Sequence, residues 1–387
     1  MTLCATVILV APSASAEDTP KPDNEGSPVL TLSIRCDALV AKVGDEVPIT
    51  FVIKNKGDSD YQYPDRTYDR SGRMGEYELT AVDEEGKVVP DPRAKRRGGI
   101  GGGVERQGRL APGESFTKSI ALNRWALLTK PGVYRVAGTY RTAGSRREVR
   151  SPALTLELKP RTDEEMAAHV QALTDQLATT RDGHTRAARV RKLMYTCDRR
   201  IVPALIETMY ESGPARDDAG YWAGEAFHYY LPDDQAVGDA LLHAAANRGL
   251  AVGMFWTLKQ RGFTREQIRP LIEVSLSPDH RVAWSEGALA AQEYADDRFT
   301  PRLIAIAKDP ENTARVPTIY ALALNRTDES VATLKALLVE PDPPNPMGRT
   351  IRQTTEDAIR SAYVYRGNAQ GRLLRTDDFD LKYQRPN

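Results

Sequence analysis

The sequence is poor in cysteine, has no net charge and contains no long apolar run. Only 3 of its 387 residues are cysteine, which excludes a framework of several disulfides. Its 53 basic and 53 acidic side chains cancel, whereas nucleic-acid-binding proteins are usually strongly basic. No segment approaches the run of about 18 apolar residues that a transmembrane helix needs. We therefore expect no nucleic-acid partner and no integral membrane segment in the mature chain.

The chain also lacks the motifs of common catalytic and cofactor sites. The glycine-rich stretch 98–103 has no Gly-Lys-Ser/Thr ending, so it is neither a P-loop nor a dinucleotide fingerprint. Glu225 and His228 match half of a carboxylate-bridged metal site, but no other histidine supplies the second half. The sequence Trp-Ser-Glu-Gly at 284–287 is not a nucleophile elbow. We predict no enzyme activity, no metal and no cofactor; a catalytic site assembled only in three dimensions is the alternative.

The N-terminus predicts export. Residues 3–11 form a short apolar run, and Ala14-Ser15-Ala16 has the small-residue pattern of a cleavage site, although no basic residue precedes the run. We expect residues 1–16 to be a signal peptide and residues 17–28 a disordered polar linker, which makes the protein secreted or periplasmic. The alternative is a disordered N-terminal tail that is not cleaved.

Residues 29–159 have the pattern of short β-strands. Apolar residues alternate with period two in several segments, and turn-forming residues separate these segments. Six or seven strands in about 130 residues predict an Ig-like β-sandwich. The phrases V-I-K-N-K-G (52–57), L-A-P-G-E-S (110–115) and K-P-G-V-Y-R-V (130–136) resemble those of bacterial extracytoplasmic Ig-like modules. They also loosely resemble the BsuPI-like proteinase-inhibitor module.

The C-terminal half repeats one helical phrase. Five leucines within apolar runs follow one another at spacings of 36, 30, 32 and 31 residues: Leu205, Leu241, Leu271, Leu303 and Leu334. Self-similarity at this period is typical of stacked helix pairs. The pattern resembles HEAT-like repeats, with a shorter period than full HEAT repeats. It predicts a HEAT-like α-solenoid over residues 160–370 and a flexible tail over 371–387, so the fold class is multidomain, all-β followed by all-α.

The junction between the two halves is short. Thr162 and Glu165 have the spacing of a capping box, which predicts a helix beginning at about Asp163. Because few residues connect the halves, we expect them to pack against each other. Cys36 and Cys197 are either two buried free thiols or a bridge between the halves, and the sequence leaves both readings open.

Candidate partner-binding residues come from two patterns. Aromatic residues gather in one predicted helix and the start of the next repeat, which indicates either packing on the β-sandwich or a partner-binding patch. The residues of this pattern are Tyr221, Trp222, His228, Tyr229 and Trp256. The second helix of each repeat is expected to line the concave face of a solenoid. Exposed positions on these second helices are Glu207, Tyr210, His243, Glu273 and Lys335.

The combined pattern predicts a non-catalytic protein–protein interaction or scaffold protein of the cell envelope. Its partner is an unknown protein, bound through the concave face of the helical repeats. The alternative is that the β-sandwich acts as a glycan-binding or proteinase-inhibitor-like module that the solenoid displays. Tyr61, Tyr63, Tyr68 and the basic stretch 93–97 motivate this alternative.

Overall fold

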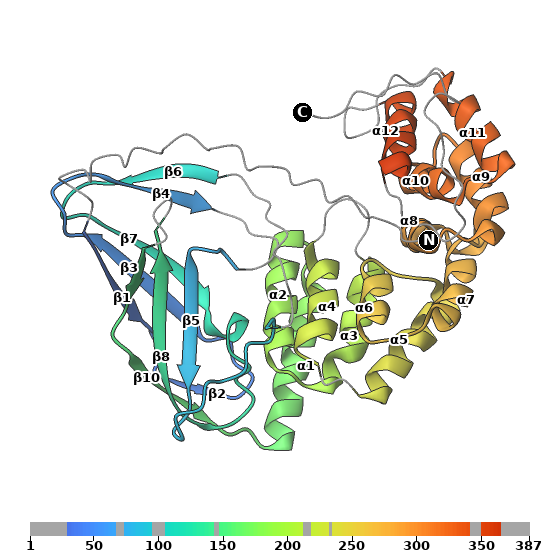
Figure 1. Ribbon diagram of the computed structural model, residues 1–387. Coiled ribbons are helices and arrows are strands. Elements are labelled where there is room, and N and C mark those ends of the chain that lie inside the picture. The colour runs from blue at the N-terminus through green and yellow to red at the C-terminus, as the bar shows by residue number, and fades with distance from the viewer. Residues whose placement is uncertain are drawn as a thin grey trace, which may run out of the picture.

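The computed structural model in Figure 1 shows a β region followed by a helical region. It describes residues 29–66, 73–94, 105–142, 147–211, 218–231, 234–340 and 350–364. The strands end at Lys159 and the first α-helix begins at Asp163, which confirms the expected order of β then α. The predicted signal peptide, linker and C-terminal tail lie outside the described residues, as do Tyr68 and the glycine-rich stretch 98–103.

The β region contains two larger sheets and a two-stranded pair. The first sheet is antiparallel, in the order β1 (Leu30–Arg35), β3 (Pro48–Asn55), β7 (Ser115–Ala121). The second sheet has the order β2 (Val40–Lys42), β10 (Leu154–Lys159), β8 (Gly132–Arg141), β5 (Tyr77–Val82), with β9 (Glu148–Arg150) beside β8. Strand β4 (Tyr61–Arg66) pairs with β6 (Glu105–Leu110). Among the described strands only β2 and β10 pair in parallel, so the last of these strands returns beside an early one.

Alternating burial along the strands produces one apolar core in the β region. In β3 every second side chain, at Ile49, Phe51 and Ile53, is fully buried. Val136 of β8 and Leu156 of β10 are equally buried in the same core, so both larger sheets contribute to it. This is the period-two pattern expected of strands with one face toward a core.

The helices pair along the chain and form two rows. What we call the inner row consists of α2 (Gly183–Tyr195), α4 (Asp218–Tyr229), α6 (Met254–Gln260), α8 (Trp284–Tyr294), α10 (Arg315–Asn325) and α12 (Ile351–Val364). The outer row consists of α3 (Val202–Glu211), α5 (Gln235–Arg248), α7 (Arg265–Ser275), α9 (Thr300–Lys308) and α11 (Asp328–Leu338). Consecutive members of the inner row pack together, as do most of those in the outer row, and α1 (Asp163–Thr179) packs on α2. Each of the five repeated leucines lies in the outer row and is buried.

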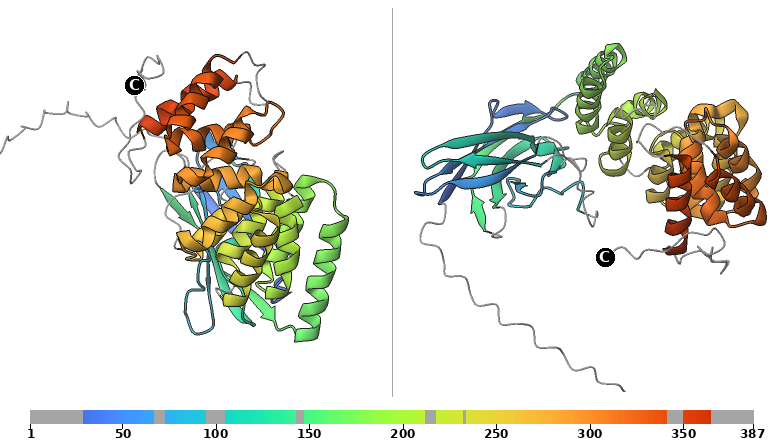
Figure 2. Two further views of the ribbon diagram at one scale, coloured as in Figure 1. Left: turned by 90° about the vertical axis from the view of Figure 1, so that its right-hand side faces the viewer. Right: turned by 90° about the horizontal axis from the view of Figure 1, so that it is seen from above.

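The rows bend so that the inner row faces the β region, as Figure 1 and the second view in Figure 2 show. This differs from our expectation, because the second helix of each repeat belongs to the outer row and lies on the convex side. Side-chain size gives the physical reason. Buried positions of the inner row are rich in small residues, among them Ala219, Ala223, Gly287, Ala288 and Ala321. Helices with small contact residues approach more closely than helices with leucines between them, so the array closes toward the inner row.

Within the described ranges, no helix combines the length and the apolar character that crossing a bilayer requires.

For two glycines of the inner row we expect a substitution by alanine to change the free energy of unfolding in opposite directions. At Gly224 an added Cβ would lie 3.7 Å from Thr257 Oγ1, an ordinary contact, so Gly224→Ala should stabilise the fold by up to about 1 kcal/mol through helix propensity. At Gly287 the added Cβ would lie 2.7 Å from the Cβ of Ser275, so Gly287→Ala should destabilise by about 1–3 kcal/mol. Urea unfolding of both variants measures the difference. Equal effects would contradict the close approach of α8 to the end of α7 at Gly287.

Candidate functional site

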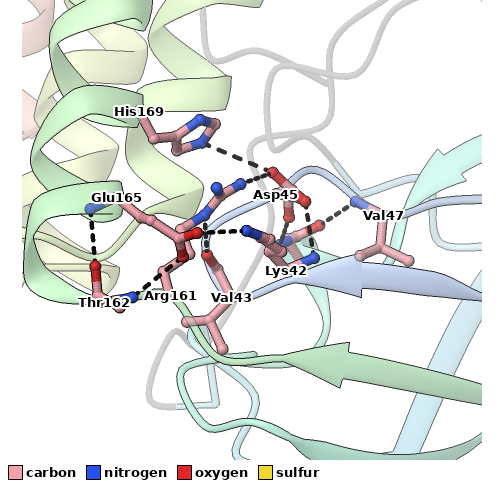
Figure 3. Close-up of polar contacts among 9 residues, drawn as sticks. Lys42, Val43, Asp45, Val47, Arg161, Thr162, Glu165 and His169 are labelled. Carbon is pink, nitrogen blue, oxygen red and sulfur yellow. Dashed lines mark hydrogen bonds and ion pairs between the residues drawn. The ribbon is translucent and has the colours of Figure 1, made fainter.

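The β region and the helical region meet directly, and Figure 3 shows the junction between them. Only residues 160–162 separate β10 from α1. The Thr162 hydroxyl accepts a hydrogen bond from the Glu165 amide at 3.1 Å, and the Glu165 carboxylate accepts one from the Thr162 amide at 3.2 Å. The predicted capping box is therefore confirmed, and it fixes the direction in which α1 leaves the sheet.

Asp45 connects the β region to this junction. Its carboxylate accepts a hydrogen bond from the Arg161 guanidinium and one from the Lys42 amide at 2.8 Å. The His169 Nε2 atom on α1 lies 3.8 Å from Asp45 Oδ1. Burial and then the Arg161 charge lower the pKa of His169, and the nearby Asp45 carboxylate opposes this shift. A cleft of about 530 Å³ opens beside Asp45 and His169.

Trp222 of α4 forms a second contact between the regions. Its ring is 5% exposed and lies beside two guanidinium groups. The central carbon of Arg124, in the 3-10 turn Leu122–Arg124, is 5.3 Å from the ring centroid, and that of Arg191 on α2 is 5.2 Å away. The Arg124 Nε atom also donates to the Tyr195 hydroxyl of α2 at 3.3 Å. The aromatic cluster was interpreted either as packing on the β region or as a partner-binding patch. Trp222 packs against the β region.

A buried ion pair forms the third contact. Arg93 of the β region and Glu225 of α4 are 8% and 5% exposed, and their charged groups are in direct contact. The Arg93 guanidinium also lies 5.2 Å from the ring centroid of Tyr229. The Glu225 carboxylate, whose spacing to His228 matches half of a metal site, is therefore paired with an arginine. Throughout the described residues, no three His, Cys, Asp or Glu side chains gather as a metal site would require.

A cleft of about 780 Å³ opens at the same interface. Residues 90–92 line it from the β region, and His228, Tyr229 and Arg261 line it from α4 and the end of α6. The Arg261 Nη2 atom donates to the Phe227 carbonyl at 2.9 Å, which ties this side of the cleft together. Two of the residues predicted from the aromatic cluster, His228 and Tyr229, therefore lie at a concave surface.

Two large apolar side chains of the inner row are exposed, and we call them the inner-row patch. Trp256 of α6 is 45% exposed, and Leu289 of α8 is 39% exposed. The Lys259 ammonium lies 5.1 Å from the Trp256 ring centroid and pairs with Glu293, so an ion pair joins α6 to α8 beside the patch. Sequence reasoning found Trp256 but missed Leu289. The sequence contained one signal for it: Leu289 does not share the helical face on which most of the small residues of α8 lie.

The candidates from the second helices are spread along the outer row. Glu207 pairs with Arg248 at 2.5 Å, and the Tyr210 hydroxyl donates to the Gly249 carbonyl at 2.6 Å. His243, Glu273 and Lys335 lie on α5, α7 and α11 and are exposed. The structure does not bring this set together with the aromatic residues of α4 and α6. Tyr221 is half-buried, with its ring edge against Trp222.

Tyr61 and Tyr63, two of the tyrosines that motivated a binding role for the β region, are engaged in packing. Tyr61 is 5% exposed, and its hydroxyl is 3.1 Å from that of Tyr140. The Tyr63 ring stacks on Phe116 with a centroid distance of 4.0 Å. These rings therefore offer little surface to a ligand.

Both described cysteines are free thiols. Burial raises the pKa of Cys197 to about 12, and burial is also the main cause that raises the pKa of Cys36. A raised pKa keeps a thiol protonated, and the protonated form is a poor nucleophile. The sequence left open whether these cysteines are free thiols or form a bridge, and in the structure both are free.

One carboxyl in the inner row has a strongly perturbed pKa. Burial raises the pKa of Glu286 on α8 to about 7, against a smaller opposing effect of a hydrogen bond with the Gly253 backbone. Its Oε2 atom is buried and has no hydrogen-bond partner in the described part of the chain. Perturbed carboxyls occur at catalytic sites, but no nucleophile or second acid is among the causes of this shift.

No protein-family model matches the chain, and neither does any curated protein. Among solved structures, the CARDB domain of the PF1109 protein from Pyrococcus furiosus, described in complex with di-metal ions, is 13% identical with a TM-score of 0.19. The match covers 35% of this chain and 96% of that domain. The β-glucosidase EmGH1 from Erythrobacter marinus (15% identity, TM-score 0.20) and one from Listeria innocua (13%, 0.19) each match over 34% of this chain and 16% of their own length. Likenesses this weak assign neither a family nor an activity.

The Arg93–Glu225 pair predicts a strong non-additive effect on stability. Glu225→Gln should lower the free energy of unfolding by about 3–5 kcal/mol, because Arg93 would stay buried without its anionic partner. The double variant Arg93→Met/Glu225→Leu should be closer to wild type than Glu225→Gln. Urea unfolding measures all three proteins.

The exposed pair of Lys42 and Glu165 is the matched control. Its side chains are 42% and 45% exposed, so Lys42→Met should cost less than about 1 kcal/mol. A loss in Glu225→Gln no larger than this would show that the buried pair does not hold the two regions together.

Proposed function

We propose that this chain is a non-catalytic binding or scaffold protein of the cell envelope. In this proposal an Ig-like β-sandwich is fixed to a HEAT-like solenoid, and the solenoid binds a protein partner on its inner row. The observation that carries the proposal is the exposure of Trp256 and Leu289, two large apolar side chains on neighbouring helices of that row.

The packing of the chain supports the two architectures. Two sheets with a common core are what a sandwich requires. Two rows of helices with a buried leucine at each repeat are what a solenoid requires. The apolar core of the helical region continues from Val170 on α1 to Ala362 on α12, so neighbouring repeats bury one another's faces.

The inner-row patch has the composition of a protein-binding site. Tryptophan is among the residues most enriched at binding hot spots, because it buries a large area at a small cost in conformational entropy. Lys259 and Glu293 border the patch with opposite charges, which matches the usual arrangement of an apolar centre inside a polar rim. Single exposed apolar residues are common on protein surfaces, but here two of them lie on adjacent helices of the inner row.

A partner should depend on this patch. We expect Trp256→Ala/Leu289→Ala to weaken binding at least about tenfold, since each lost anchor typically costs more than about 1 kcal/mol. The partner is first identified by crosslinking from native envelope, with the chain from residue 17 as bait, and is then purified. Titration calorimetry with the purified partner gives the dissociation constants.

The outer row provides a matched control for this experiment. Glu273→Ala/Lys335→Ala removes two exposed side chains of the outer row and should change the dissociation constant less than about threefold. A large loss in this variant alone would assign binding to the outer row. Unchanged binding in both variants would sink the inner-row proposal and favour the glycan-binding or inhibitor-like alternative for the β region.

Location in the envelope has its own test. If residues 1–16 are a signal peptide, the protein recovered from a secreting bacterial host should begin at Glu17. N-terminal sequencing of the secreted or periplasmic fraction reads this directly. Recovery of the protein only from the cytoplasm, with residues 1–16 retained, would contradict export.

A further inference from the structure

The cleft of about 530 Å³ beside Asp45, which we call the junction cleft, has walls of opposite charge. Asp45 and Glu46 line it with carboxylates from the segment between β2 and β3, whereas Arg189 and Lys192 line it with cations from α2. Arg189 and Lys192 are three residues apart in one helix, so they share a face. A volume of this size is typical of small-molecule sites, so the junction cleft can hold a ligand that contacts both walls.

Arg189 presents hydrogen-bond donors that the protein does not use. Its Nη1 atom donates to the Gln176 side chain of α1 at 2.6 Å, which fixes the orientation of the guanidinium group. Among the described residues, neither its Nε atom nor its Nη2 atom has a hydrogen-bond partner, and the Nε atom is buried. These two atoms form the edge of the guanidinium group that a carboxylate bridges with two parallel hydrogen bonds. A buried donor without an acceptor is unfavourable, so a carboxylate bound at this edge would satisfy it.

Glu46 is the carboxylate of the opposite wall that a ligand can reach. Its side chain is 33% exposed, and its one partner in the described part of the chain is Lys192, at 3.9 Å. Two atoms at that distance do not share a hydrogen bond, and ion pairs as exposed as this one contribute little to stability. Asp45, by contrast, is held by Arg161 and by the Lys42 amide. A ligand ammonium group can therefore replace Lys192 beside Glu46 at small cost.

Apolar side chains also line the junction cleft. They are Ala38, Val40, Ala41, Pro48 and Leu173. Val40 on β2 is 48% exposed, although it is a large apolar residue. An aliphatic group of a ligand in the junction cleft would remove part of this surface from water.

We propose that the junction cleft binds a small zwitterion, either an aliphatic amino acid or a short peptide that ends in one. The ligand carboxylate lies on the Nε–Nη2 edge of Arg189 with Lys192 nearby. The ligand ammonium group lies at Glu46, and its side chain packs on Val40. A ligand of one charge sign would meet a wall of its own sign, whereas a zwitterion complements both walls. The junction cleft shares no residue with the inner-row patch, so this inference does not depend on the proposed function.

Calorimetric titration of the full chain at neutral pH with L-leucine, and in parallel with leucyl-leucine, tests the site. Both probes carry one ammonium and one carboxylate group, and the one that binds more tightly distinguishes a free amino acid from a peptide. We expect saturable binding by the wild type and at least about tenfold weaker binding by Arg189→Gln, a loss of ~1.4 kcal/mol. Arg189→Lys keeps the charge but loses the planar edge, so its affinity should fall between the two.

Two blocked derivatives of leucine test which group lies at which wall. Leucinamide keeps the ammonium group and N-acetyl-leucine keeps the carboxylate, so each should bind the wild type more weakly than leucine does. Arg189→Gln should weaken the binding of N-acetyl-leucine but not that of leucinamide, and Glu46→Gln should do the reverse. If neither derivative binds measurably, both charges are required, which also supports a zwitterion. Equal losses for both derivatives in Arg189→Gln would indicate a purely structural role and would overturn the proposal.

Arg199 provides the control, because it is exposed, follows α2 and does not line the junction cleft. Arg199→Gln should bind leucine like the wild type. No saturable binding of either zwitterion by the wild type, or equal losses in Arg189→Gln and Arg199→Gln, would also overturn the proposal.

Thermal unfolding checks that the variants fold. Leucine should raise the unfolding midpoint of the wild type and of Arg199→Gln but not that of Arg189→Gln. Glu46→Gln loses only an exposed ion pair, so it should fold even if Arg189→Gln does not. In that case, binding of leucine by Glu46→Gln as tight as by the wild type would contradict the proposal, and binding at least about tenfold weaker would support it.

Discussion

The arrangement of the two regions depends on a charged contact from which water is excluded. Arg93 and Glu225 are almost fully buried, and a charge in such a place is tolerated only with a partner of opposite sign. The pair therefore permits one relative position of α4 and the β region and penalises the others. Once α4 is fixed, the helices that follow are placed by packing on their neighbours, so the direction of the helical region follows from its first helices.

Local features of this structure could be predicted, because their causes are close together in the sequence. The Thr162–Glu165 capping box spans four residues, and its hydrogen bonds are those the spacing indicated. The alternation in β3 and the repeated leucines each reflect one buried face of one element. In such cases the residues of a short segment determine its secondary structure and its buried face, without a contribution from residues distant in the sequence.

The contacts between the regions could not be predicted in the same way. Arg93 begins the basic stretch that motivated a binding role for the β region, and nothing near it in sequence points to Glu225 on α4. The side toward which the helices bend was also mispredicted, because it depends on the summed size of many alanines and glycines in the inner row rather than on any one of them. Leu289 escaped notice for a related reason: whether a leucine in an alanine-rich helix is covered depends on the neighbouring repeats.

The parallel pairing of β2 with β10 has a consequence for the order in which the molecule assembles. β10 is the last strand of the β region and joins β2 to β8, so this sheet remains open until the segment ending at Lys159 is available. Helix α1 follows β10 after three residues. Arg93 can pair with Glu225 only after α4 has been synthesised. A chain that emerges from its N-terminus thus holds an unfinished sheet for much of its synthesis. Such intermediates expose strand edges that favour wrong pairings until the later segments are present.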